Sequence, residues 1–211
     1  FLSTSDSSFI PSWARWNFSG YEGKPAYPEY RDIVQTMDTL GETNGCGRAM
    51  WEHEEQHDRY GTPMALMLLP FWTDGCIGSM EGLFFEAAGT TPYHFITAAA
   101  MSKQSSNPVR ELRYDNNDAA KGVAYMRALG VKYFMGFTPE AVTAASAQPG
   151  LIKVAQSGPW VIFRVTESDL VVPLTVQPVV VAMTSGDPRE RWLEIGTSWF
   201  QHANEWAALP A

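Results

Sequence analysis

The order of helical and strand patterns between residues 118 and 166 constrains the fold of this chain more than any other feature of its sequence. Apolar residues at helical spacing stop at Gly130, and a strand-like run follows at once. Such alternation is typical of a sheet covered by helices, so we predict an α+β (or α/β) fold with a mixed sheet and flanking helices. The patterns are a helix at 118–129, a strand at 131–137, a helix at 139–148 and a hairpin of 151–155 with 160–166.

The segments on both sides of this stretch belong to the same domain. A β-rich run at 170–183 contains Pro173 and Pro178, which restrict it to an edge strand or an extended linker. Asp187 suits the N-cap of a helix with tryptophans near one face. Further patterns are a helix at 27–40, a strand at 47–52 and a helix at 93–101. We therefore predict a single compact domain with an irregular lead-in at 1–26, a mixed α/β part at 27–183 and a C-terminal helical segment at 184–211 packed on it.

The composition limits the partners that this chain can bind. Of its 211 residues, 45% are hydrophobic, which excludes disorder as the main state. Its net charge of −8 argues against nucleic acid and against anionic lipid, because both attract a basic surface. Only 18% of the residues are charged, so uncharged partners such as sugars, peptides or lipid headgroups suit it best. The sequence contains no run of about 20 apolar residues, the length that spans a bilayer.

The two cysteines, Cys46 and Cys76, both lie in glycine-rich turns. Neither has a second cysteine nearby, which argues against CxxC redox and zinc-ribbon sites. A pair of cysteines in such turns suits a disulfide in an oxidising compartment, and this is our prediction. The alternative is two unrelated buried thiols.

His53, Glu54 and His57 match the H-E-x-x-H motif of zinc metalloproteases. On a helix, the two histidines would share one face and Glu54 would act as the base toward a zinc-bound water. A metalloprotease helix is buried, however, whereas the string EHEEQHDRYG is polar throughout and ends at Gly61. His53 and His57 are thus metal candidates by motif alone; we interpret the segment as a solvated polar loop and expect no metal and no cofactor.

The stretch from Gly61 to Phe95 combines the longest apolar run with acids and aromatic residues. Indole faces beside carboxylates suit a neutral glycan, which stacks on rings and donates hydroxyl hydrogen bonds. We predict that the polar side chains of this stretch gather around one concavity beside the cysteine turns. A glycosidase-like carboxylate pair, Glu81 with Glu86, is an alternative use of the same residues, and we assign no catalytic residue. The candidate binding residues are Trp72, Asp74, Glu81, Glu86, Tyr93 and His94.

Six strings of the sequence carry a resemblance to a known family. They are RAMWE (48–52), YGTPMALMLLPFWTDG (60–75), MEGLFFEAAGTTPYHF (80–95), SNPVR (106–110), LGVKYFMGF (129–137) and PWVIFRV (159–165). Through them the chain resembles the extracytoplasmic portion of actinobacterial multi-spanning membrane proteins. These are related to the glycosyltransferase-like membrane proteins described as YfhO-like or 6-pyruvoyl-tetrahydropterin-synthase-related. The resemblance covers somewhat over half of the chain and says little about residues 1–26 and 170–211.

The resemblance implies a location and a role. In such proteins the membrane helices are expected to carry the lipid-linked sugar donor site and the catalytic acids, while the soluble domain faces the outside. We therefore expect an extracytoplasmic, membrane-tethered, non-catalytic domain that binds or positions glycan in cell-envelope assembly. Its expected partners are a glycan or lipid-linked sugar and the transmembrane portion of the parent protein, and no nucleic acid. The alternatives are a self-contained secreted hydrolase, using zinc at H-E-x-x-H or the carboxylate pair, and a structural or protein-interaction domain.

Overall fold

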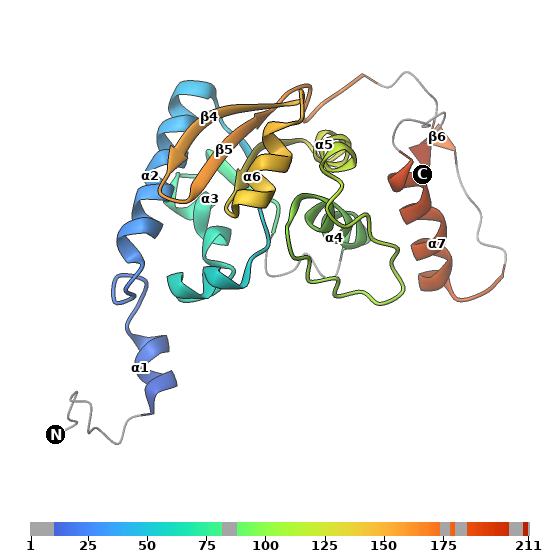
Figure 1. The fold of residues 1–211 in the computed structure, drawn as a ribbon. Helices are drawn as coiled ribbons and strands as arrows, with labels where there is room; N and C mark the ends of the chain where they lie inside the picture. Colours follow the sequence, from blue (N-terminus) through green and yellow to red (C-terminus); the bar gives the residue numbers. More distant parts are fainter. Residues whose placement is uncertain (1–10, 82–87, 174–177, 180–184, 203–208, 211) are drawn as a thin grey trace.

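A five-stranded mixed sheet forms the centre of the protein in the computed structural model (Figure 1). The structure describes residues 11–81, 88–173, 178–179, 185–202 and 209–210. The strand order is β2-β1-β3-β5-β4; β2, β1 and β3 are parallel, and β5 is antiparallel to both of its neighbours. The strands are β1 (Gly47–Trp51), β2 (Ile77–Ser79), β3 (Val131–Gly136), β4 (Leu151–Ser157) and β5 (Trp160–Val165). The predicted α+β fold, a mixed sheet with flanking helices in one compact domain, is confirmed.

The hairpin of β4 and β5 forms the antiparallel half of the sheet, as the sequence predicts. Gly158 turns the chain between the two strands with a φ of 54°, a left-handed conformation that glycine adopts without strain. The register between the strands shifts between Lys153 and Ala155, which places an irregularity in β4, one of the two edge strands. A second, two-stranded parallel sheet pairs β6 (Pro178–Val179) with β7 (Leu209–Pro210).

Helix α2 (Tyr27–Asn44) covers one face of the five-stranded sheet. Its apolar stripe, which includes Ile33 and Met37, lies in one buried cluster with Trp51, Tyr133 and Ile162 of the strands. The connection from β1 to β2 contributes to the same cluster. It consists of the 3-10 helices η1 (Glu55–Tyr60) and η2 (Ala65–Leu68) and the short helix α3 (Leu69–Trp72).

Helix α2 extends beyond the predicted range of 27–40, in which the glycine after residue 40 was expected to end the helix; Gly41 lies inside it. A Cβ atom at this position would lie 2.6 Å from the Sγ atom of Cys76 and 3.3 Å from the Cδ1 atom of Ile77. The glycine therefore permits the close approach of β2 and its cysteine to the helix, and the helix continues to Asn44.

Helices α5 (Ala119–Ala128) and α6 (Pro139–Ser146) cover the opposite face, close to their predicted positions. Phe134 of β3 belongs to the buried cluster on this side, together with Val123 of α5 and Ala145 of α6. Its neighbours Tyr133 and Met135 belong to the cluster on the α2 side. The alternation follows the two-residue period of a strand that is buried on both faces.

A third layer packs on α5, beyond the sheet. It consists of α4 (Thr91–Met101) and α7 (Pro188–Gln201), which share a cluster with Tyr125 of α5. Phe200 stacks on Tyr93 and on Tyr125, with ring centroids 4.4 and 4.7 Å apart. Asp187 caps α7, as the sequence predicts, by accepting hydrogen bonds from two backbone N–H groups of the first turn. The layers place α7 far from α2, on the other side of the sheet (Figure 1).

The lead-in, predicted as irregular, contains a short helix, α1 (Ser12–Phe18). No side chain of α1 is buried, so the helix lacks the apolar stripe by which a sequence pattern would reveal it. Lys24 holds it instead: its ammonium donates hydrogen bonds to the carbonyl of Trp16 and the hydroxyl of Ser19.

The β-rich run expected at 170–183 is described only in part. Residues 171–173 are not strand, and the short β6 is the strand found in the described part of this run. None of the helices that the structure describes is long and apolar enough to cross a membrane.

Candidate functional site

Cys46 and Cys76 form a disulfide, as the sequence predicts. Each cysteine directly precedes a strand, and these strands, β1 and β2, are parallel neighbours, so the two Cα atoms lie 4.6 Å apart. The N–H of Gly47 donates to the carbonyl of Cys76 at 3.0 Å, which continues the backbone pairing up to the bridge. The bridge therefore fixes the amino ends of both strands.

Phe71 and Trp72 form an exposed aromatic pair on α3. Their side chains are 69% and 41% exposed, and their rings meet edge to face with centroids 4.7 Å apart. The Trp72 indole N–H donates to the Tyr30 hydroxyl at 2.9 Å, which holds the indole in one orientation. Asp74 follows in an exposed turn with a φ of 48°. We call Phe71, Trp72 and Asp74 the α3 platform; it combines ring faces for stacking with a carboxylate that accepts hydrogen bonds from hydroxyls.

Glu81 and His94 form a close histidine–carboxylate pair at the other end of β2. Glu81 follows the strand, His94 lies in the first turn of α4, and the Oε1 and Nε2 atoms are 3.1 Å apart. Both side chains are largely buried. The pair joins a strand end to a helix start, and a histidine–carboxylate pair can also position or transfer a proton.

Tyr93 lies between α4 and α7. Its ring stacks on Phe200 and contacts Trp192 and Trp199, all three on α7. Burial raises the pKa of Tyr93 to about 12, so its hydroxyl stays protonated at neutral pH. Tyr93 thus packs one helix on another.

The described members of the predicted binding set occupy three places and do not line one concavity. Trp72 and Asp74 precede β2 on the α2 side, Glu81 and His94 meet after β2, and Tyr93 lies against α7. Glu86 lies outside the described residues. These residues are separated because β2 runs between them: Trp72 and Asp74 lie before the strand and Glu81 lies after it, at the opposite end.

Glu52 is a fully buried carboxylate at the carboxyl ends of β1 and β3, with 0% of its surface exposed. One oxygen accepts the backbone N–H groups of Phe137 and Thr138, each at 2.8 Å. The other accepts the Thr138 hydroxyl at 2.6 Å and the backbone N–H of Lys103 at 3.2 Å. These four bonds join β1 to the start of α6 and to the loop after α4, so we interpret Glu52 as a structural anchor.

The H-E-x-x-H residues do not form the α-helix that this type of zinc site needs. The 3-10 helix η1 begins at Glu55, so His53 lies outside it and the two histidines do not share a helical face. The Nδ1 atom of His53 lies 3.0 Å from the carbonyl oxygen of Gln104. Among the described residues, no group of three or more His, Cys, Asp and Glu side chains is arranged to hold a metal ion.

The expectation of a solvated loop is wrong for His57, which is buried. Its imidazole ring packs against Tyr60, Phe137 and Trp160, with centroids 4.8 to 6.2 Å apart. Burial lowers the pKa of His57 to about 3, and the nearby charges of His53 and Arg59 add to this effect. The neutral imidazole behaves as a flat aromatic ring, which explains its place in the core.

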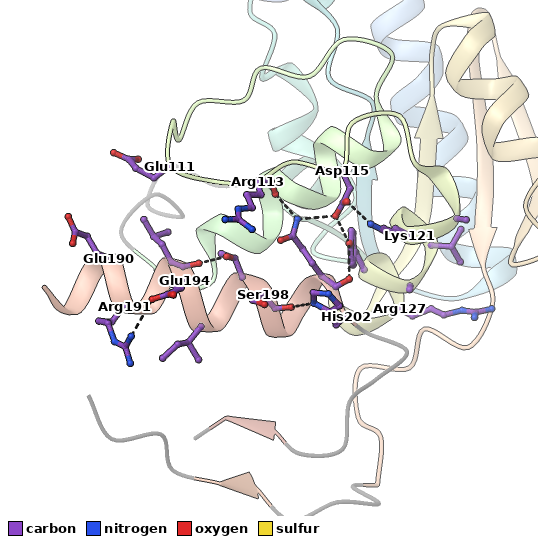
Figure 2. Close-up of a pocket in the computed structure, with 18 residues that line it drawn as sticks. Glu111, Arg113, Asp115, Lys121, Arg127, Glu190, Arg191, Glu194, Ser198 and His202 are labelled. Carbon is purple, nitrogen blue, oxygen red and sulfur yellow. Dashed lines mark hydrogen bonds and ion pairs between the residues drawn. The ribbon is translucent and has the colours of Figure 1, made fainter. Parts of the chain in front are cut away.

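A groove of about 1260 Å³ lies between α5, α7 and residues 111–115 (Figure 2). We call it the α5–α7 groove. The acids in its described lining are Glu111, Asp115, Glu190 and Glu194. The bases are Arg113, Lys121, Arg127 and Arg191. The sequence did not indicate this site, because its walls come from segments about 70 residues apart; the charges that alternate with apolar residues in 187–202 were its only local signal.

Asp115 joins the two walls of the α5–α7 groove. Its carboxylate accepts hydrogen bonds from the Lys121 ammonium at 2.6 Å, the Tyr125 hydroxyl at 2.8 Å and the Gln201 amide at 2.9 Å. Burial alone would raise the pKa of Asp115, but these hydrogen bonds and the Lys121 charge outweigh it and hold the pKa below its ordinary value. The ionised carboxylate therefore links α5 to α7 at neutral pH (Figure 2).

Two of these places are open to a ligand, the α3 platform and the α5–α7 groove. The Glu81–His94 pair and Glu52 are enclosed and bonded within the fold. No protein-family model, no curated protein and no solved structure matches this chain.

Proposed function

We propose that this chain is a non-catalytic, extracytoplasmic domain of a glycosyltransferase-like membrane protein, and that it binds or positions glycan in cell-envelope assembly. The α3 platform carries this proposal. Its exposed rings match the apolar face of a sugar, and Asp74 can accept hydrogen bonds from the hydroxyl edge. The resemblance to glycosyltransferase-like membrane proteins supports the membrane context, and the disulfide supports an oxidising compartment.

The α3 platform is organised before any ligand arrives. The hydrogen bond to Tyr30 holds the Trp72 indole, and the Tyr30 hydroxyl in turn donates to the Ala65 carbonyl at 2.9 Å. A side chain that is already ordered loses little rotamer freedom on binding. Stacking on one ring pair with one carboxylate nearby is nevertheless a small contact. We therefore expect a dissociation constant of about 1 mM, or about −4 kcal/mol.

The buried polar groups support a positioning role for the domain. Glu52 uses its oxygens for four bonds within the fold, and Glu81 pairs with His94 in a largely enclosed place. A catalytic acid or base needs to reach a substrate within hydrogen-bond distance. The α3 platform, in contrast, offers exposed rings and a single carboxylate, whereas a glycosidase site needs two carboxylates.

An NMR titration with neutral oligosaccharides of two to six sugars tests the proposal. Amide resonances around residues 70–76 should shift in the wild type, and Trp72→Ala should abolish the shifts because the stacking face is gone. Trp13→Ala is the matched control, since Trp13 is an exposed tryptophan (66%) on α1. The proposal is wrong if glycan still binds to Trp72→Ala. It is also wrong if no sugar shifts these resonances at about 10 mM, which is tenfold the expected dissociation constant.

A further inference from the structure

The size and shape of the α5–α7 groove indicate an elongated occupant. Its volume of about 1260 Å³ exceeds the roughly 300–1,000 Å³ of typical small-molecule pockets. Its lining follows α7 from Glu190 to His202 (Figure 2). These two residues are 12 positions apart, and a helix rises 1.5 Å per residue, so the groove is about 18 Å long. This length fits about 12 residues of a helix or about five residues of an extended chain.

The groove has an apolar floor and a charged rim. Val123 of α5 and Leu193 of α7, both buried, contribute the floor. The four acids and four bases of the described lining cancel in formal charge. This balance of charges in the described lining disfavours both polyanions and polycations, and it suits an occupant that carries both signs.

Two rim charges of opposite sign have no ion pair within the described part of the chain. They are the guanidinium of Arg113, in the loop before α5, and the carboxylate of Glu190, in the first turn of α7. A third position can also adapt, because the pair of Arg191 with Glu194 at 3.3 Å is exposed and such surface pairs are worth only about 0–1 kcal/mol. The rim can therefore exchange internal contacts for contacts with a partner.

The lining disfavours a sugar. Tyr125 is the one tyrosine, tryptophan or phenylalanine among the described lining residues; it is only 1% exposed, and its hydroxyl is bonded to Asp115. The exposed ring of the described lining is the imidazole of His202, just after α7. Within the described lining a sugar would thus find no exposed tryptophan, tyrosine or phenylalanine face for stacking, whereas the apolar side chains of a peptide fit the floor and its charges fit the rim.

We infer that the α5–α7 groove binds a polypeptide segment of a partner, in which apolar side chains are flanked by charges of both signs. The groove and the α3 platform lie on opposite sides of the sheet, so peptide binding is independent of glycan binding. The domain would then connect two partners of different chemistry.

Selection from a displayed library of random peptides of about 12 residues, on the folded full chain, tests this inference. Enriched peptides should carry both acids and bases around apolar residues. Arg113→Glu should weaken them about tenfold, and replacing the facing acid of the peptide with lysine should restore binding. Arg31→Glu, an exposed charge reversal on α2, is the matched control and should leave binding unchanged.

The outcomes separate this inference from the proposed function. Trp72→Ala should abolish sugar binding and leave peptide affinity unchanged. The inference is wrong if no peptide is enriched, or if enriched peptides bind Arg113→Glu and wild type equally. It is also wrong if neutral oligosaccharides, and not peptides, shift the amide resonances of α5 and α7.

Discussion

Replacing Glu52 with alanine tests whether one buried carboxylate holds the carboxyl ends of β1 and β3 together. The substitution leaves the backbone N–H groups of Phe137 and Thr138 without an acceptor in a buried place. Each buried donor without a partner costs about 1–3 kcal/mol, so we expect a loss of about 4 kcal/mol in the free energy of unfolding. The third backbone donor, Lys103, is exposed and can bond to water. The expected loss is a large part of the roughly 5–15 kcal/mol that stabilises a typical domain.

Glu52→Gln provides a graded version of the same test. Its amide oxygen can keep both backbone bonds of Phe137 and Thr138, and its NH₂ group can donate to the Thr138 hydroxyl. The hydrogen bond from the Lys103 N–H would be lost, because this N–H would then face the NH₂ group of the glutamine, which is also a donor. We therefore expect a loss of about 1 kcal/mol, well below that of Glu52→Ala.

Urea denaturation followed by tryptophan fluorescence, with the disulfide intact, measures both losses. Glu140→Gln is the matched control, because Glu140 lies nearby at the start of α6 and pairs with Lys103 in an exposed position. Its urea midpoint should stay close to that of the wild type. If Glu52→Ala unfolds within about 1 kcal/mol of the wild type at an unchanged m-value, the anchor interpretation fails and a reactive role for this carboxylate has to be considered.

Three further predictions concern the bridge, the buried histidine and the glycine of α2. Thiol titration of the unfolded, unreduced protein should detect no free thiol, and Cys46→Ser with Cys76→Ser should lower stability by about 3–4 kcal/mol, the chain-entropy value for a separation of 30 residues; two titratable thiols would exclude the bridge. Because the pKa of His57 is lowered to about 3 in the folded state, the unfolded state takes up a proton first as pH falls below about 6.5. Stability measured in urea should therefore fall between pH 6.5 and 3, by up to about 1.4 kcal/mol per unit, and His57→Phe should reduce this slope; an equal slope in both proteins would refute the assignment. Gly41→Ala should lower the melting temperature, since its Cβ would lie 2.6 Å from the Cys76 sulfur; a higher melting temperature would show that the helix propensity of alanine wins.

The local part of the fold could be predicted from the sequence because its signals act over a few residues. The stop at Gly130, with a φ of 61°, separates α5 from β3, and the hairpin turn at Gly158 sets the pairing of β4 with β5. The cysteine pairing also followed from composition and turns. The stop and the hairpin need little information beyond their own segments, and the cysteine pairing follows because the sequence has two cysteines.

The parts that could not be predicted depend on residues distant in the chain. His57 is polar by type, yet rings from Phe137 and Trp160 enclose it. Gly41 resembles a helix stop, and only the position of Cys76 explains why it is not one. The candidate binding residues are near one another in sequence, but β2 carries them to different ends. The α5–α7 groove depends most on residues distant in the chain, since one wall comes from residues 111–127 and the other from residues 190–202.

The parallel pairing of β1 with β3 bears on how the chain folds. Arg48 pairs with Val131, so this contact closes a loop of about 80 residues, whereas β3, β5 and β4 pair within a short stretch of chain. Contacts between distant residues form more slowly than local ones, so the antiparallel half should assemble first. The cysteines are separated by only 30 residues and can be oxidised before β1 reaches the sheet. During that interval the edge of β3 is open to strands of other copies, so the refolding yield should fall as protein concentration rises.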